Sequence, residues 1–92
     1  MTPVEWNRRA ADELIDAAEF YDGRQAGLGE AFLAAAAQTA HRIAEHPRAF
    51  PFVADDIRRA NLPRRWPYSL FFVIKPDRSV VIATLSHRQD LR

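Results

Sequence analysis

The chain has 92 residues, of which 48% are hydrophobic, with a net charge of +1 and no cysteine. This length leaves room for one small domain, residues 1–92, and the composition is typical of a globular fold. Disulfides and thiolate metal sites are excluded because cysteine is absent. No apolar run reaches the ~20 residues that span a bilayer, and no secretory signal pattern is present. We therefore expect a cytoplasmic protein.

The net charge conceals an asymmetry between the two parts of the chain. Residues 1–56 contain five arginines and ten acids, which gives −5, whereas residues 57–92 contain seven arginines and one lysine against two acids, which gives +6. Arginine binds phosphate and carboxylate groups in a bidentate way and is weakly hydrated. The basic C-terminal part is therefore the expected recognition surface.

The first predicted elements are a short strand and a helix. Pro3 to Trp6 alternates apolar and polar residues, as a strand does. Asn7 is a good N-cap for a helix over residues 8–22, in which apolar residues recur at three- and four-residue spacing. Gly23 is the expected end of that helix.

A second helix is predicted from Leu28 to Glu45 or His46, because Pro47 pushes the residue before it out of the helical region. Its run of four alanines, residues 34–37, lets another element approach closely. Two helices of similar length with a short connection predict an antiparallel helical hairpin.

Three further strands are predicted in the C-terminal part. Residues 48–56 are expected to be irregular, with phenylalanines closing the end of the core. A strand over residues 57–62 follows, and the apolar runs Tyr68–Ile74 and Val80–Leu85 form a β-hairpin around a short polar link. The order is β-α-α-β-β-β. It indicates an α+β fold, an antiparallel sheet of about four strands with the helical hairpin packed on one face.

The β-hairpin is apolar on both faces. A sheet with one solvated face should alternate apolar and polar residues. Phe71 and Val73 nevertheless stand opposite the face formed by Leu70 and Phe72. The helices can cover only one face, so the other must be closed by sheet curvature, by the C-terminal tail or by another chain. We predict that a partner peptide covers part of it.

The most suggestive chemical group is His87 with Arg88, just past the last strand and near the arginines at 58, 64 and 65. One interpretation is a cationic site for a phosphate or an acidic partner, with His87 available for proton transfer. The other is a solvated sheet edge whose charges discourage aggregation. Asp55 and Asp56 are either metal ligands or, more typically, a turn or partners of the arginines. His41 and His46 miss the spacing of a helical zinc pair, so no metal and no cofactor are expected.

Together these residues resemble the RelE/ParE superfamily of bacterial toxins from type II toxin–antitoxin systems. The resemblance spans nearly the whole chain. It rests on an ordered set of short motifs at matching spacing: Val4-Glu5-Trp6, Phe20-Tyr21, Gly27-Leu28-Gly29 with Phe32, Ile43-Ala44-Glu45-His46-Pro47, Ile57-Arg58-Arg59, Pro67-Tyr68 and His87-Arg88. It implies the α+β fold and a cognate antitoxin whose disordered C-terminal part folds onto the toxin, giving a hetero-oligomer in which the apolar sheet is covered.

The superfamily has two activities. RelE-like members cut messenger RNA in the ribosomal A site, using basic residues on the sheet and a tyrosine or histidine near the C-terminus. ParE-like members poison DNA gyrase through a protein contact. The chain has a single lysine, no tyrosine after Tyr68 and an acid in its tail, so we favour the ParE-like branch and expect no enzymatic activity. The alternatives are a ribosome-dependent mRNA endoribonuclease and a non-toxic, antitoxin-binding relative that acts as a repression partner.

The resemblance also assigns candidate residues. Those for target binding are Arg58, Arg59, Arg64, Arg65, His87 and Arg88, and those for catalysis, if the protein is a nuclease, are His87, Arg64 and Arg88. Antitoxin binding is predicted for Phe71 and Val73 and, along the helices, for Leu14, Ile15 and Phe32. For these three helical residues, packing within the chain is the alternative interpretation.

Overall fold

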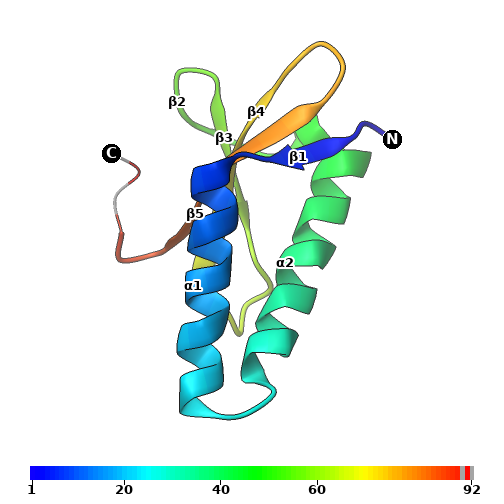
Figure 1. Cartoon of the computed structure of the whole chain (residues 1–92). Helices are drawn as coiled ribbons and strands as arrows, with labels where there is room; N and C mark the ends of the chain where they lie inside the picture. Colours follow the sequence, from blue (N-terminus) through cyan, green and yellow to red (C-terminus); the bar gives the residue numbers. More distant parts are fainter. Residues whose placement is uncertain (90, 92) are drawn as a thin grey trace.

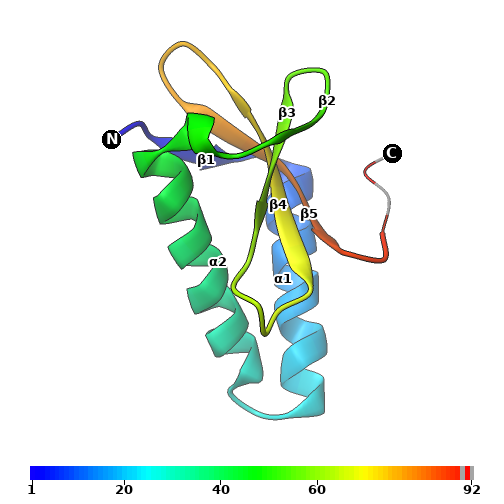
Figure 2. The same cartoon turned by 180° about the vertical axis from the view of Figure 1, so that it is seen from behind.

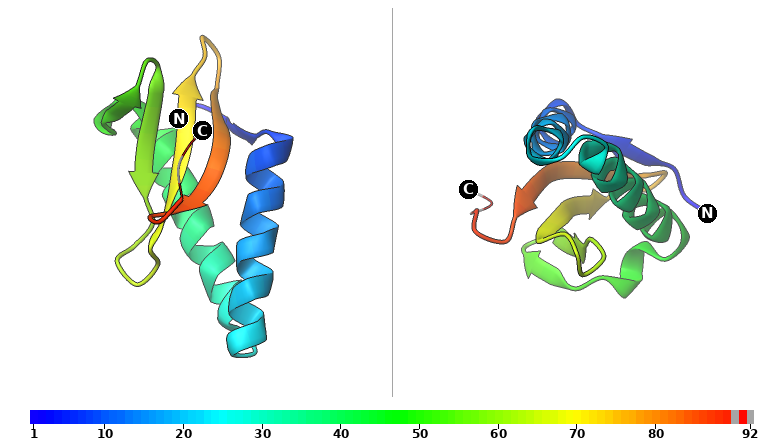
Figure 3. Two further views of the ribbon diagram at one scale, coloured as in Figure 1. Left: turned by 90° about the vertical axis from the view of Figure 1, so that its left-hand side faces the viewer. Right: turned by 90° about the horizontal axis from the view of Figure 1, so that it is seen from below.

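The computed structural model describes residues 1–89 and 91. Two helices precede most of the sheet in the chain, and both lie on one side of it (Figures 1 and 3). The elements, in chain order, are β1 (Val4–Trp6), α1 (Arg8–Arg24), α2 (Leu28–Glu45), a 3-10 turn (Pro47–Ala49), β2 (Phe52–Ala54), β3 (Ile57–Asn61), β4 (Tyr68–Ile74) and β5 (Ser79–Ser86). The predicted α+β fold is confirmed. Among the described residues, no helix combines the length and apolar character that crossing a bilayer requires.

The helical hairpin is fixed at both ends by local contacts. The side chain of Asn7 accepts a hydrogen bond from the Ala10 amide at 2.8 Å, as predicted for the N-cap of α1. Gly23 does not end the helix, which continues to Arg24. The left-handed residue is instead Gly27, at φ 89°, immediately before α2. Glycine adopts this conformation without steric cost, so the turn between the helices depends on it.

The sheet has five strands in the order β1-β5-β4-β3-β2. Two details differ from the prediction. The segment expected to be irregular contains β2, which pairs antiparallel with β3, and β1 pairs parallel with β5, so the sheet is mixed. The helical hairpin and strands β2 to β4 lie between β1 and β5 in the chain, so this pairing is a contact between segments distant in sequence. Figure 2 shows β2 and β3 at the edge opposite β1.

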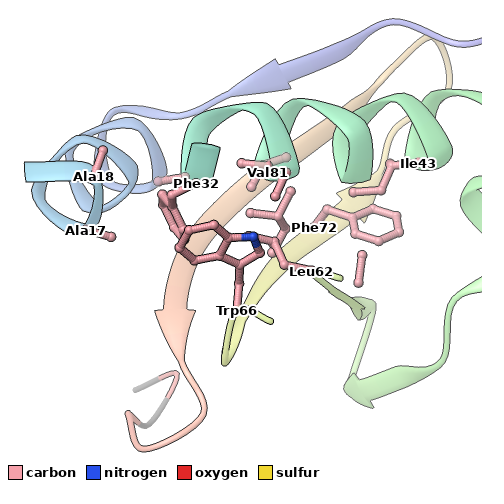
Figure 4. Packing of buried hydrophobic residues seen from close by; sticks show 13 residues of the cluster. Ala17, Ala18, Phe32, Ile43, Leu62, Trp66, Phe72 and Val81 are labelled. Carbon is pink, nitrogen blue, oxygen red and sulfur yellow. The ribbon is translucent and has the colours of Figure 1, made fainter. Parts of the chain in front are cut away.

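The core lies between the helices and the sheet face that they cover, here called the covered face. Phe32, Leu70, Phe72 and Val81 are all fully buried there. The Phe32 and Trp66 rings pack edge to face with centroids 5.4 Å apart, and Figure 4 shows both beneath α2, with Phe72 and Val81 beside them. Alanines on both helices keep this layer thin, since small side chains let the helix backbones approach the sheet closely: Ala10, Ala17, Ala18, Ala35 and Ala36.

Hydrogen bonds also connect α1 of the helical hairpin to β5. Beyond Val81, the edge of β5 that faces away from β4 has no paired strand among the described residues, because β1 pairs only with residues 79–81. There, Glu13 Oε1 accepts the Thr84 amide at 2.9 Å, and the Thr84 hydroxyl donates to the Ala10 carbonyl at 3.0 Å. These contacts satisfy the exposed edge of β5 from within the chain.

Candidate functional site

The candidate site lies on the face of the sheet turned away from the helices, here called the open face. Side chains alternate between the faces along each strand, and cross-strand pairing places Arg59 beside Phe71, and Phe71 beside Ala83, on this face. The residues at its centre are buried by the curved sheet itself: Ser69, Val73, Ala83 and Leu85. Phe71 and Ile57 remain half-buried. The described residues thus close the open face only in part.

An open pocket with a volume of about 720 Å³ occupies the remaining part, and we call it the sheet pocket. Its floor is formed by Phe71 and Ile57. One wall comes from β2 and the other from the segment after β5. The described residues that line it are Val53, Ala54, Ile57, Arg59, Phe71, Arg88, Gln89 and Leu91. The lining is therefore apolar at its base, and its charged members among the described residues are two arginines.

The structure brings together only two of the six predicted target-binding residues. Arg59 and Arg88 are both exposed and both line the sheet pocket. Arg64 and Arg65 lie in the β3–β4 connection and are not among the lining residues, and the guanidinium of Arg65 stacks 4.8 Å from the Trp66 ring centroid. The arginines therefore form no single cluster. The two arginines that line the pocket come from β3 and from the segment after β5.

Arg58 has a structural role. It pairs across strands with Phe72, which places it on the covered face of the sheet, opposite Arg59. Its guanidinium donates to the Phe50 carbonyl at 2.8 Å and to the Arg48 carbonyl at 3.3 Å, and it stacks 3.8 Å from the Phe52 ring centroid. These contacts hold the segment that leads into β2, so Arg58 belongs to the fold.

His87 is tied to the sheet. Its Nε2 atom lies 3.1 Å from the buried hydroxyl of Ser69, which in turn lies 2.6 Å from Asn61 Oδ1. Sequence reasoning missed Asn61 and Ser69. They face each other across β3 and β4, and the six-residue connection between the strands does not fix the register that would reveal this.

The residues predicted to bind an antitoxin are divided between the core and two surfaces. Phe71 lines the sheet pocket, and Val73 lies beneath the surface beside it at 9% exposure. Phe32 is fully buried and Leu14 packs against the core, so these two side chains belong to the hydrophobic core. Ile15 is 53% exposed, in a groove on the outside of the helical hairpin.

The remaining polar candidates form no metal centre. Asp55 and Asp56 make the two-residue link between β2 and β3, where Asp55 adopts φ 43°. Aspartate tolerates this left-handed conformation better than most residues, which explains its place in the turn. Across residues 1–89 and 91, no three side chains of His, Asp or Glu gather as a metal would require.

Comparison with known proteins gives a consistent result. Residues 4–91 match the family described as the ParE toxin of the type II toxin–antitoxin system, parDE. The fold is similar to a solved chain from the chromosomal ParDE TA system from P. aeruginosa, with a TM-score of 0.69 and 21% sequence identity. The alignment covers 94% of this chain and 96% of that one. Among curated proteins, no significant match was found.

Proposed function

Because the chain belongs to the ParE toxin family of type II toxin–antitoxin systems, we propose that it is a growth-inhibiting toxin that poisons DNA gyrase. In this proposal a cognate antitoxin neutralises it within a toxin–antitoxin hetero-oligomer. The toxin would meet both gyrase and the antitoxin in the cytoplasm, where gyrase works.

The composition of the sheet pocket supports a protein target. Phe71 and Ile57 offer an apolar floor, and Arg59 and Arg88 stand at its rim. An apolar side chain flanked by carboxylates would match both features, since apolar burial and charge complementarity together define most protein contacts. A site for RNA phosphates would instead need several guanidinium groups around one point, and Arg58, Arg64 and Arg65 do not line this pocket. This pocket is the observation that carries the proposal.

The same pocket supports a mode of neutralisation. A folding antitoxin segment with an apolar anchor and acidic neighbours would fill the space over Phe71 and pair with Arg59 and Arg88. The surface that contacts the target would then be occluded. The antitoxin would also complete the cover of the open face, which the chain leaves unfinished around Phe71 and Ile57.

A gyrase assay tests the target. Purified toxin is incubated with DNA gyrase and supercoiled plasmid, and double-strand breaks are counted. We expect breaks to accumulate, and the double variant Arg59→Glu with Arg88→Glu to reduce them by about tenfold or more, as loss of an interface hot spot would. The control is Arg8→Glu, an exposed arginine of α1 outside the pocket lining.

The alternatives predict different outcomes. Codon-phased cuts in messenger RNA during translation, without gyrase-linked breaks, would instead establish a ribosome-dependent endoribonuclease. Absence of both activities in a chain that still binds its antitoxin would establish a non-toxic repression partner. Either result would overturn gyrase poisoning.

The antitoxin site is tested separately, by co-purification with the antitoxin and titration of the purified pair. Phe71→Ser should weaken the complex by about tenfold or more, because an interface aromatic commonly carries that much of the binding energy. Phe20→Ser is a matched control, since Phe20 is 55% exposed on α1 and lies outside the sheet pocket. Ile15→Ser tests the groove of the helical hairpin. If only Ile15→Ser weakens the complex, the antitoxin binds the helices and the proposed pocket is wrong.

A further inference from the structure

A short chain of hydrogen bonds joins the ends of three strands beneath the C-terminal segment. Asn61 ends β3, Ser69 lies at the start of β4, and His87 follows β5. Ser69 Oγ lies 2.6 Å from Asn61 Oδ1 and 3.1 Å from His87 Nε2, and the Ser69 side chain is only 1% exposed. A buried hydroxyl with two partners is fully satisfied and holds both in place.

The number of hydrogens in this network determines that the Nε2 atom of the histidine carries a hydrogen. The Ser69 hydroxyl carries one hydrogen and donates it to Asn61 Oδ1, a carbonyl oxygen that can only accept. The contact between Ser69 and His87 therefore needs its hydrogen from the imidazole, so Nε2 is the donor. Both the neutral Nε2–H tautomer and the imidazolium carry this hydrogen. The histidine thus keeps the bond in either charge state, and Nε2 is not free to accept a proton.

Further bonds extend this anchor to the following residues. The His87 amide donates to the Pro67 carbonyl at 2.9 Å. Gln89 closes a small ring with Ser86, because its amide donates to the Ser86 carbonyl at 3.0 Å and its Oε1 accepts the Ser86 amide at 2.8 Å. Arg9 of α1 then donates to the Leu91 carbonyl at 3.3 Å. These contacts position Arg88, Gln89 and Leu91 as one wall of the sheet pocket.

We propose that Asn61, Ser69 and His87 form a latch that holds the C-terminal segment against the sheet and so sets the position of Arg88. His87 is in this view a positioning residue, which acts through the segment that it anchors. That the three residues hold the C-terminal segment is inferred from the hydrogen bonds within the chain alone. Its consequence for toxicity rests on the proposed function, because only there does Arg88 contact a target.

The first test uses the complete chain without any partner. Long-range nitrogen–proton correlation spectra of the histidine rings should show the hydrogen of neutral His87 on Nε2. Ser69→Ala should speed exchange of the His87 and Gln89 amides by about tenfold, as loss of one partly buried hydrogen bond allows. The control is Ser79→Ala, which also removes a buried hydroxyl but one without a hydrogen-bond partner among the described residues. A hydrogen on Nδ1, or equal exchange rates in the two variants, would overturn the latch.

The second test separates positioning from proton transfer. His87→Gln places an amide NH₂ near the position of Nε2, so it retains a donor for Ser69 but has no basic nitrogen. His87→Ala has neither. If the latch is correct, His87→Gln retains slow amide exchange and gyrase-dependent breaks, and His87→Ala loses both. If both variants lose activity while the glutamine variant retains slow exchange, His87 acts chemically and the positioning role is wrong. If the wild-type chain gives no gyrase-dependent breaks, the proposed function fails, and the exchange and tautomer measurements still decide the latch.

Discussion

The covered and open faces of the sheet are built from alternate residues of the same strands, and they differ in how they are closed. On β4, Leu70 and Phe72 are fully buried under the helices, whereas their neighbour Phe71 stays half-buried at the floor of a pocket. The covered face is closed because alanine-rich helices can approach it closely. Among the described residues, the open face is covered by the segment after β5 and by part of β2 alone, and Phe71 and Ile57 stay half-buried. Its apolar residues therefore remain available to a partner.

The largest expected difference between the faces concerns stability. Phe72→Ala should reduce the free energy of unfolding by about 3–5 kcal/mol, because it leaves a cavity in the core. Phe71→Ala should cost about 1 kcal/mol or less, since that side chain already lies partly in solvent. Urea unfolding of both variants measures the difference. Equal losses would show that the open face contributes to the fold as much as the covered face, contrary to this comparison.

A smaller effect should show how the helices are kept close enough to cover their face. A Cβ atom on Gly29 would lie 2.5 Å from the Ala18 carbonyl oxygen and 2.8 Å from Asp22 Oδ1. Gly29→Ala should therefore force the helices apart and cost about 1–3 kcal/mol, as overpacking does. Gly23→Ala is the matched control, because no atom lies within 4 Å of its added Cβ. Within a helix this change should stabilise by about 0.5–1 kcal/mol, and thermal unfolding would reveal opposite shifts. Shifts of the same sign would contradict close packing at Gly29.

Two adjacent arginines of β3 allow the covered and open faces to be compared within a single strand. Arg58 bonds two carbonyls on the covered side, and Arg59 faces the sheet pocket. Arg58→Ala should cost about 1–2 kcal/mol of stability, because charged hydrogen bonds to the Arg48 and Phe50 carbonyls are lost, and it should leave antitoxin affinity unchanged. Arg59→Ala should change stability by less than about 0.5 kcal/mol and weaken the antitoxin complex. Urea unfolding and titration of the complex measure the two properties, and the reverse pattern would exchange the roles of the two residues.

The elements themselves could be predicted from the sequence because their signals are local. The bounds of the predicted α2 and β4 agree with the structure, since an alanine-rich period and a run of β-branched and aromatic residues each indicate one element. β2 was missed because Phe52–Ala54 has only three residues, all exposed, and forms a strand through pairing with β3. The parallel placement of β1 likewise depends on contacts distant in sequence.

The candidate site was less predictable for the same physical reason. Whether Arg58 or Arg59 faces the pocket depends on strand register, and a shift of one residue exchanges the two faces. The basic composition of residues 57–92 indicated a cationic surface but could not show that Arg64 and Arg65 lie away from the pocket. The latch joins Asn61, Ser69 and His87, and the first and last of these lie 26 positions apart in the sequence. No spacing rule connects them.

The smallest expected effect concerns how far water reaches into the covered face around Tyr68, which packs beside Phe32 and Tyr21. Burial raises the pKa of the Tyr68 hydroxyl above its ordinary value, and the charge of an ionised Tyr21 raises it further. Because the pKa is higher in the folded state, the unfolded chain loses its proton first as the pH rises. The stability from Tyr68 is therefore complete below about pH 10, where an unfolded tyrosine ionises, and is lost as the pH rises through the folded-state pKa. Urea unfolding between neutral and strongly alkaline pH should show a shallower decline for Tyr68→Phe than for the wild type. An ultraviolet titration that found Tyr68 ionising as readily as in the unfolded chain would mean that water reaches its hydroxyl. The covered face would then be closed to water elsewhere but not around Tyr68.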